Sequence, residues 1–218
     1  MDMDIARAAR RRHSCKAFDA DRKIPPELFG QLRELLRWSP SSTNSQPWHF
    51  VVAATPDGKA RVAESAHGLF AYNAPKIQNA SHVVVLCARR DMEPEYLEAL
   101  LAQEQADGRF DSGEARTRQA QVRGFYVGHQ RTAGKLEAWM EKQVYLALGG
   151  LLLGAGALDI DACPMEGFDA AMLDEALGLP ARGLTSRVVV ALGYRSGDDF
   201  NAAAPKSRLP EAAIFTDI

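Results

Sequence analysis

Hydrophobic positions recur at helical spacing directly after a pair of prolines near the start of the chain. Leucines at positions 28, 32, 35 and 36 follow Pro25 and Pro26. Proline suits the first turn of a helix because its missing N–H would have no partner there. This pattern predicts an amphipathic helix. Further helices are predicted over residues 59–66, 94–106, 114–130, 137–158 and 169–177.

Three short runs rich in β-branched residues, at positions 49–53, 82–87 and 187–192, are typical of buried strands. Helical segments separate these runs, so the pattern predicts an α+β domain. Residues 144–158 are nearly all apolar and include four glycines. The stretch is shorter than the roughly 20 residues that a membrane span needs, and we expect a buried central helix.

Two stretches show no such periodicity. Residues 39–47 combine two prolines with short hydrogen-bonding side chains and predict an ordered polar loop. Residues 198–218 form a tail with little helical or strand pattern. We expect that tail to be stable only if it lies against another surface.

Composition narrows the class of protein. With 218 residues, of which 25% are charged, the chain is expected to form a single globular domain over 1–218. A formal net charge of -2 gives no general attraction to nucleic acid or to an anionic membrane. The spacing of three cysteines and five histidines predicts neither a disulfide framework nor a metal site. The N-terminus has no secretory pattern, so we expect a cytoplasmic protein.

Two basic clusters, at residues 10–16 and 206–208, could converge on one phosphate or another anion. Each also has a simpler interpretation. The first fits a solvated basic helix end, and the second fits a charged terminal segment. Contact with nucleic acid would need a basic face elsewhere, which the slightly acidic remainder of the chain does not provide.

Several longer segments decide between these interpretations. They are Arg12-His13-Ser14-Cys15-Lys16, the loop at 39–48 (Ser-Pro-Ser-Ser-Thr-Asn-Ser-Gln-Pro-Trp), Tyr72-Asn73-Ala74-Pro75-Lys76, Pro164-Met165-Glu166-Gly167-Phe168, Leu192-Gly193-Tyr194 and the stretch 205–210 (Pro-Lys-Ser-Arg-Leu-Pro). In this order they closely resemble the oxygen-insensitive NAD(P)H nitroreductase and dihydropteridine reductase family of bacteria. The resemblance runs from about Ile5 to the C-terminus. It implies a nitroreductase-like fold with a mostly antiparallel central sheet flanked by helices, and an interwoven homodimer with composite sites.

The resemblance also implies bound FMN, with NADH or NADPH as co-substrate. The residues that match the family's phosphate-binding positions are Arg12, Ser14, Lys206 and Arg208, with His13 alongside. Lys16, Asn73 and Lys76 would face the pyrimidine edge, where cations stabilise the negative charge that hydride uptake places near N1. Pro164, Met165, Glu166 and Gly167 would lie along the N5 side. Pro40, Ser41, Ser42, Asn44 and Gln143 would reach the flavin of the partner subunit.

The acceptor pocket implied by the resemblance contains Thr43, Phe70, Tyr72, Phe125 and Tyr126, although these aromatic residues equally fit ordinary core packing. The sequence departs from the family pattern at Tyr126, where phenylalanine is common, and is one residue shorter before Gln143. These departures leave the substrate range open. Cys15 could be a reactive thiolate, but we favour an inert thiol.

The expected reaction transfers two electrons in ping-pong fashion from NAD(P)H to nitroaromatics, quinones or dihydropteridine. No glycine-rich nucleotide-binding loop follows a strand, so donor and acceptor would share one pocket. No side chain is required as an acid or base; Lys16, Lys76 and Glu166 would act through electrostatics. The alternatives are enoate or flavin reduction on the same scaffold, or a non-catalytic flavin-binding protein.

Overall fold

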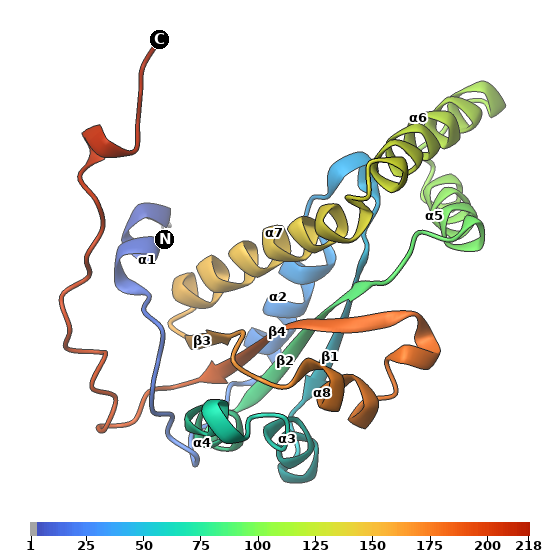
Figure 1. Cartoon of the computed structure of the whole chain (residues 1–218). Helices are drawn as coiled ribbons and strands as arrows, with labels where there is room; N and C mark the ends of the chain where they lie inside the picture. The colour runs from blue at the N-terminus through green and yellow to red at the C-terminus, as the bar shows by residue number, and fades with distance from the viewer. Residues whose placement is uncertain (1–3) are drawn as a thin grey trace.

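The computed structural model describes residues 4–218, and its centre is a four-stranded antiparallel sheet (Figure 1). The strands are β1 (Trp48–Ala53), β2 (His82–Arg89), β3 (Asp161–Met165) and β4 (Leu184–Gly193). They are ordered β1-β2-β4-β3, so the two longest strands lie in the middle. The predicted mostly antiparallel sheet is confirmed, and all three predicted strands are present with slightly wider bounds.

Strand β3 was not predicted, because it is short and contains Pro164, which cannot donate a ladder hydrogen bond. It lies at the edge of the sheet and pairs only with β4 among the named strands. The strand also contacts the N-terminal segment, because Ala162 forms a bridge with Ser14 just before Pro164 and Met165.

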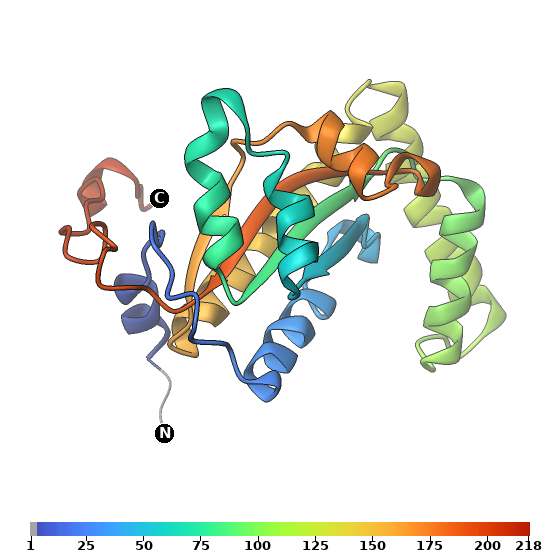
Figure 2. The same cartoon turned by 90° about the horizontal axis from the view of Figure 1, so that it is seen from below.

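Helices cover both faces of the sheet. One face carries α2 (Pro26–Arg37) and α7 (Leu136–Ala157), and the other carries α3 (Pro56–Ala63), α4 (Ala74–Asn79) and α8 (Ala170–Ala176) (Figures 1 and 2). The side chains of β2 alternate between these two layers. Val83 and Val85 join the core with α3, α4 and α8, whereas Val84 and Leu86 join the core with α2 and α7. Burial on both faces explains why this strand is a continuous apolar run.

The remaining elements extend from this three-layered body. Helices α5 (Pro94–Ala106) and α6 (Gly113–Thr132) form a hairpin that projects beyond the sheet, and α1 (Ile5–Arg11) lies at the C-terminal end of α7 (Figure 1). Four short 3-10 segments complete the described part of the chain: η1 (Ser42–Asn44), η2 (Gly68–Asn73), η3 (Pro180–Arg182) and η4 (Glu211–Ala213).

The predicted helices are all present, with one clear shift in boundary. Helix α3 starts three residues earlier than the predicted 59–66, because the side chain of Thr55 accepts a hydrogen bond from the amide of Gly58 and Pro56 occupies the first turn. The short, arginine-rich α1 was not predicted as an element, and neither was α4.

Helix α7 is buried on one side only, which corrects the expectation of a buried central helix. Val144, Ala147 and Leu151 face the sheet and are fully buried, but Leu146 is 53% exposed on the opposite side. Glycines 149 and 150 are exposed there as well. No helix in the described part of the chain is both long and apolar enough to cross a membrane.

Candidate functional site

The segment after α1 runs in extended form beside strand β3. Ser14 forms a parallel bridge with Ala162, and the amide of Cys15 donates to the carbonyl of Ala162 at 3.0 Å. Arg12 and Lys16 are four residues apart, so an extended chain separates them by roughly 13 Å. The segment therefore links two groups of candidate residues, one around Arg12 and the other around Lys16.

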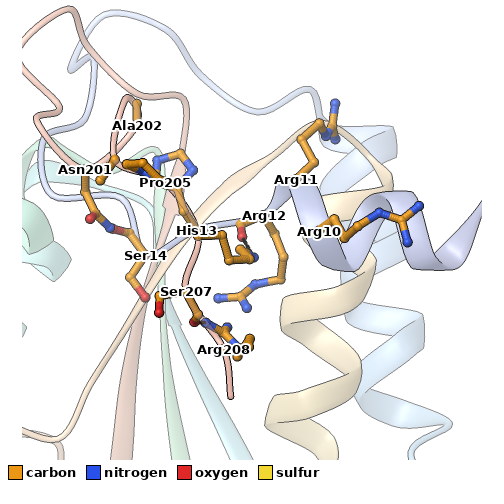
Figure 3. Close-up of a pocket in the computed structure, with 12 residues that line it drawn as sticks. Arg10, Arg11, Arg12, His13, Ser14, Asn201, Ala202, Pro205, Ser207 and Arg208 are labelled. Atoms are coloured by element: carbon orange, nitrogen blue, oxygen red, sulfur yellow. Dashed lines mark hydrogen bonds between the residues drawn. The ribbon is translucent and has the colours of Figure 1, made fainter. Parts of the chain in front are cut away.

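A cationic cavity of about 410 Å³ opens between this segment and the C-terminal arm. Figure 3 shows the side chains of Arg12, Ser14 and Arg208 converging inside it, whereas those of Arg10 and Arg11, which also line the cavity, extend outward along α1. Lys206 is tied to the same place, because its Nζ donates to the carbonyl oxygen of Ala9 at 2.8 Å and to that of Arg12. The structure thus brings together the two basic clusters of the sequence.

The charges in this cavity repel one another. Burial, followed by the charge of Arg208, lowers the pKa of Arg12. Burial and then the charges of Arg12 and Arg208 lower the pKa of Lys206. Within residues 4–218, no carboxylate pairs with any of these three side chains. The buried Nε of Arg12 also has no partner in that part of the chain. A bound anion would offset the excess positive charge and accept a hydrogen bond from the free Nε of Arg12.

Asp199 organises the walls of the cavity, and the sequence pattern did not reveal it. Its carboxylate lies 2.8 Å from Nε2 of His13 and accepts the amide of Lys16 at 3.0 Å. The neighbouring Asn201 donates to the carbonyl of Ser14 at 2.8 Å. Burial, then the charge of Asp199, raises the pKa of the buried Cys15 thiol, which fits the inert interpretation of that cysteine.

A second group surrounds the buried Lys76 of α4. Its Nζ donates to Oδ1 of Asn73 at 2.8 Å and to the carbonyl of Tyr72 at 2.9 Å. Burial lowers the pKa of Lys76, and the charge of Lys16 lowers it further. Asn73 in turn donates from Nδ2 to the carbonyl of Gly167 at 2.9 Å. Asn73, Lys76 and Gly167 therefore form one hydrogen-bonded cluster, on which the charge of Lys16 acts. Within residues 4–218, no carboxylate pairs with either lysine.

The segment after β3 lies against the same cluster. Phe70 and Tyr72, on η2, pack around Gly167. Glu166 is exposed, and its Oε1 accepts a hydrogen bond from the hydroxyl of Tyr145 on α7. Burial, and after it the bond to Glu166, raises the pKa of Tyr145, so this hydroxyl stays protonated. Tyr145 is a further residue that the sequence did not identify.

The loop between α2 and β1 holds the remaining candidates in an unusual backbone conformation. Thr43, Asn44 and Gln46 have φ angles of 53°, 53° and 43°, although none is glycine. Such residues typically store about 1–3 kcal/mol of strain each. The amide of Ser42 donates to Oε1 of Gln143 at 2.8 Å, and Ser41 Oγ accepts from the amide of Gln46 at 2.9 Å.

Within one chain, this loop group does not meet the groups around Arg12 and Lys76. Gln143 and Tyr145 are two residues apart on α7, which turns their side chains by about 200° and places them on opposite faces. Gln143 accepts a hydrogen bond from the loop, whereas Tyr145 donates one to Glu166. Phe125 and Tyr126 are exposed on α6, far from η2 and α4 (Figure 1). Pro40 is exposed at the end of α2.

Comparisons with known proteins identify the family to which this arrangement corresponds. A model of the nitroreductase family matches residues 9–194. An oxygen-insensitive NAD(P)H nitroreductase from Enterobacter cloacae is 52% identical, with 99% of this chain and 100% of the relative covered. A protein of the same description from Salmonella typhimurium is 49% identical over 99% of this chain and 100% of the relative. A candidate nitroreductase from Exiguobacterium sibiricum, solved in complex with FMN, shares the fold with a TM-score of 0.82 at 24% identity, covering 100% of this chain and 99% of that one.

Proposed function

The chain belongs to the nitroreductase family, and from this premise we propose that it is an FMN-dependent NAD(P)H oxidoreductase acting on nitroaromatics, quinones or dihydropteridine. The proposal rests on the cationic cavity, which lies at one end of an extended segment. The other end of that segment meets the cluster of Lys16 and Lys76. A phosphate at one end and a ring system at the other match that spacing and charge.

The residues of the cavity fit the phosphate of FMN. Arg12, Lys206 and Arg208 supply the positive charge, and the free Nε of Arg12 supplies an unused donor. Ser14 adds a hydroxyl, and Asp199 holds His13 beside them. Lys16, Asn73 and Lys76 would border the ring, followed by Pro164, Met165, Glu166 and Gly167. When bound, FMN would accept a hydride from NAD(P)H and pass two electrons to the acceptor.

The protein contributes positioning and electrostatics to this reaction. Lys76 is held by two hydrogen bonds and stripped of much of its hydration, so its charge is already in place when negative charge develops nearby. Asn73 fixes the backbone at Gly167. The proposal requires no side chain to give or take a proton.

A homodimer would complete the site. A largely apolar groove of about 760 Å³ lies between α2 and α7 and includes Trp38, 71% exposed, and Leu146, 53% exposed. Residues 202–218 are exposed along their whole length and include apolar side chains such as Phe215. A second copy covering these surfaces would bring Pro40, Ser41, Ser42, Asn44 and Gln143 to the neighbouring flavin. Thr43, Phe125 and Tyr126 would then close the acceptor pocket with Phe70 and Tyr72.

We further propose that residues 1–218 act as one domain and that the protein works in the cytoplasm. The three buried free thiols suit a reducing compartment.

A paired substitution tests the cofactor assignment. Arg208→Glu places a negative charge inside the cavity and is expected to weaken FMN binding roughly tenfold to a hundredfold. Arg7→Glu makes the same change at an exposed position of the neighbouring α1 that does not line the cavity, and should leave the affinity near that of the wild type. Affinity is measured by quenching of FMN fluorescence, with circular dichroism as a folding control. Equal affinities in the two variants would refute the assignment.

A further inference from the structure

A buried ion pair joins the two helices of the α5–α6 hairpin next to the loop at 41–46. NH2 of Arg123 on α6 lies 2.6 Å from Oε1 of Glu104 on α5, and the two side chains are only 1% and 5% exposed. Each also keeps one buried atom, NH1 and Oε2 respectively, without a hydrogen-bond partner in residues 4–218. Apolar residues would join the helices at least as well, so this pair calls for a role beyond packing.

Exposed Arg109 also lies 3.8 Å from Oε1 of Glu104, and the other side-chain hydrogen bonds of the pair go to the loop. Nε of Arg123 donates to the carbonyl of Thr43 at 3.0 Å, and Oε1 of Glu104 accepts from Nδ2 of Asn44 at 2.8 Å. Gln119, one helical turn before Arg123, adds a longer bond to the same carbonyl of Thr43 at 3.4 Å. The ion pair therefore forms hydrogen bonds with two consecutive residues, Thr43 and Asn44, and both have a φ of 53°.

That backbone conformation needs outside support. Residues other than glycine enter the left-handed region uncommonly, and a β-branched threonine is an outlier there. The turn directs the amide of Ser42 to Gln143 and sets where the side chains of Thr43 and Asn44 point. Arg123 also precedes Phe125 and Tyr126 by two and three residues on α6. The helix that contacts the loop through Arg123 therefore also carries the aromatic pair.

We propose that Arg123 and Glu104 are positioning residues that hold the loop at 41–46 and the aromatic pair of α6 in register, and so set acceptor binding at the composite site. This inference rests on the proposed function. Both side chains are buried, so they would act through the loop and not by contact with the cofactor or the acceptor. The planar guanidinium is essential to the role, because Nε and NH2 point to Thr43 and Glu104 at a fixed angle that a single lysine nitrogen cannot reproduce.

Two variants separate positioning from stability, both made in the FMN-loaded protein. Arg123→Met/Glu104→Leu removes both charges together and should keep the melting temperature within about 10 °C of the wild type. Arg123→Lys keeps the charge opposite Glu104 but loses the bond from Nε to Thr43. A matched control, Arg116→Met/Glu98→Leu, removes an exposed ion pair between the same two helices that does not touch the loop.

The first measurement is amide hydrogen exchange of the peptide covering residues 39–47, which needs no turnover. We expect faster exchange in both Arg123 variants and wild-type exchange in the control. The second is the KM for a nitroaromatic acceptor, which should rise on the order of tenfold while the control stays unchanged. Arg123→Lys should share both effects while melting like the wild type.

Wild-type exchange of 39–47 in Arg123→Lys and in the double variant would overturn the proposal, as would an unchanged KM in both. If the pair served only to stabilise the fold, KM would change only in variants whose melting temperature also changes. A wild-type protein that holds no FMN and oxidises no NAD(P)H would instead refute the proposed function, and hydrogen exchange of the flavin-free proteins would then decide whether the ion pair holds the loop.

Discussion

The side-chain nitrogen of Asn73 lies 2.9 Å from the carbonyl oxygen of Gly167, and a Cβ built on Gly167 would lie 3.0 Å from that same nitrogen. The glycine therefore has no room for a side chain on that side. The contact ties η2, and with it the lysine of α4, to the segment after β3. It is the point where the two halves of the proposed ring-binding cluster meet.

Gly167→Ala should separate these halves. The new methyl group would also lie 2.9 Å from Cδ1 of Phe70, so both Asn73 and Phe70 must move. We expect FMN affinity to fall by roughly tenfold, with a smaller effect on the free energy of unfolding, because the contact lies at the edge of the core. Gly128→Ala on α6, where an added Cβ meets nothing within 4 Å, is the matched control. Tight FMN binding by Gly167→Ala would show that the close approach is not needed.

Asp199 makes part of the stability depend on pH. Burial alone would raise the pKa of this carboxyl, but hydrogen bonds from His13 and from the amides of Lys16 and Asn201 hold it below its ordinary value. The stabilisation is therefore fully present above pH of about 4, the ordinary carboxyl pKa, and is lost as pH falls through the lower folded value.

Asp199→Asn should lower the free energy of unfolding near pH 7 by about 1–3 kcal/mol. It should also lose less stability than the wild type between about pH 5 and pH 3. Urea unfolding at a series of pH values measures both effects. Parallel pH profiles for the two proteins would mean that Asp199 is not responsible for this dependence.

Lys16 should control how fast NAD(P)H delivers its hydride. Its charge lies close enough to Lys76 to lower the pKa of that residue, so both cations act at one place. Lys16→Met is expected to slow flavin reduction by about tenfold, whereas Lys16→Arg should slow it less because the charge is kept. Stopped-flow absorbance of the bound flavin gives the rate. Equal rates in the methionine variant and the wild type would argue against an electrostatic role.

Association of two chains can be tested on the exposed face of α7. Leu146→Glu puts a charge into the apolar groove between α2 and α7 and should produce monomers that release FMN. Met172→Glu changes a residue of similar exposure, 44%, on α8 at the opposite face of the sheet. Sedimentation should show a dimer for the wild type and for this control. A monomeric Leu146→Glu protein that keeps its FMN would exclude the composite site.

Local pattern was sufficient for the parts of the fold that bury apolar side chains regularly. The apolar run at 82–87 and the leucines of α2 identify their elements, since in each the apolar residues follow one regular pattern over several positions. Strand β3 has no such signal, because its pairing with β4 depends on the tertiary fold and Pro164 interrupts the strand pattern. Helix α1 also lacks a regular apolar pattern, because its single buried residue is Ala8.

The candidate site, too, could be predicted only in part from the sequence. The basic clusters at 10–16 and 206–208 were visible as charge, and the structure brings them together. Asp199 was hidden in a tail without periodicity. Arg123 did leave a signal, because it falls on the helical stripe that includes Ala120 and Val127 and is therefore a charged residue at a core position. Its partner Glu104 lies 19 residues away, a distance that no local pattern spans.

We propose above that this chain holds an FMN which NAD(P)H reduces and an electron-poor acceptor reoxidises. The most direct measurement is anaerobic mixing of the purified yellow protein with one equivalent of NADH or NADPH, followed by a nitroaromatic. We expect the visible flavin absorbance to be bleached and then fully restored, and steady-state double-reciprocal plots to give parallel lines. Protein that carries no flavin, or a bound flavin that neither nucleotide bleaches, would contradict it.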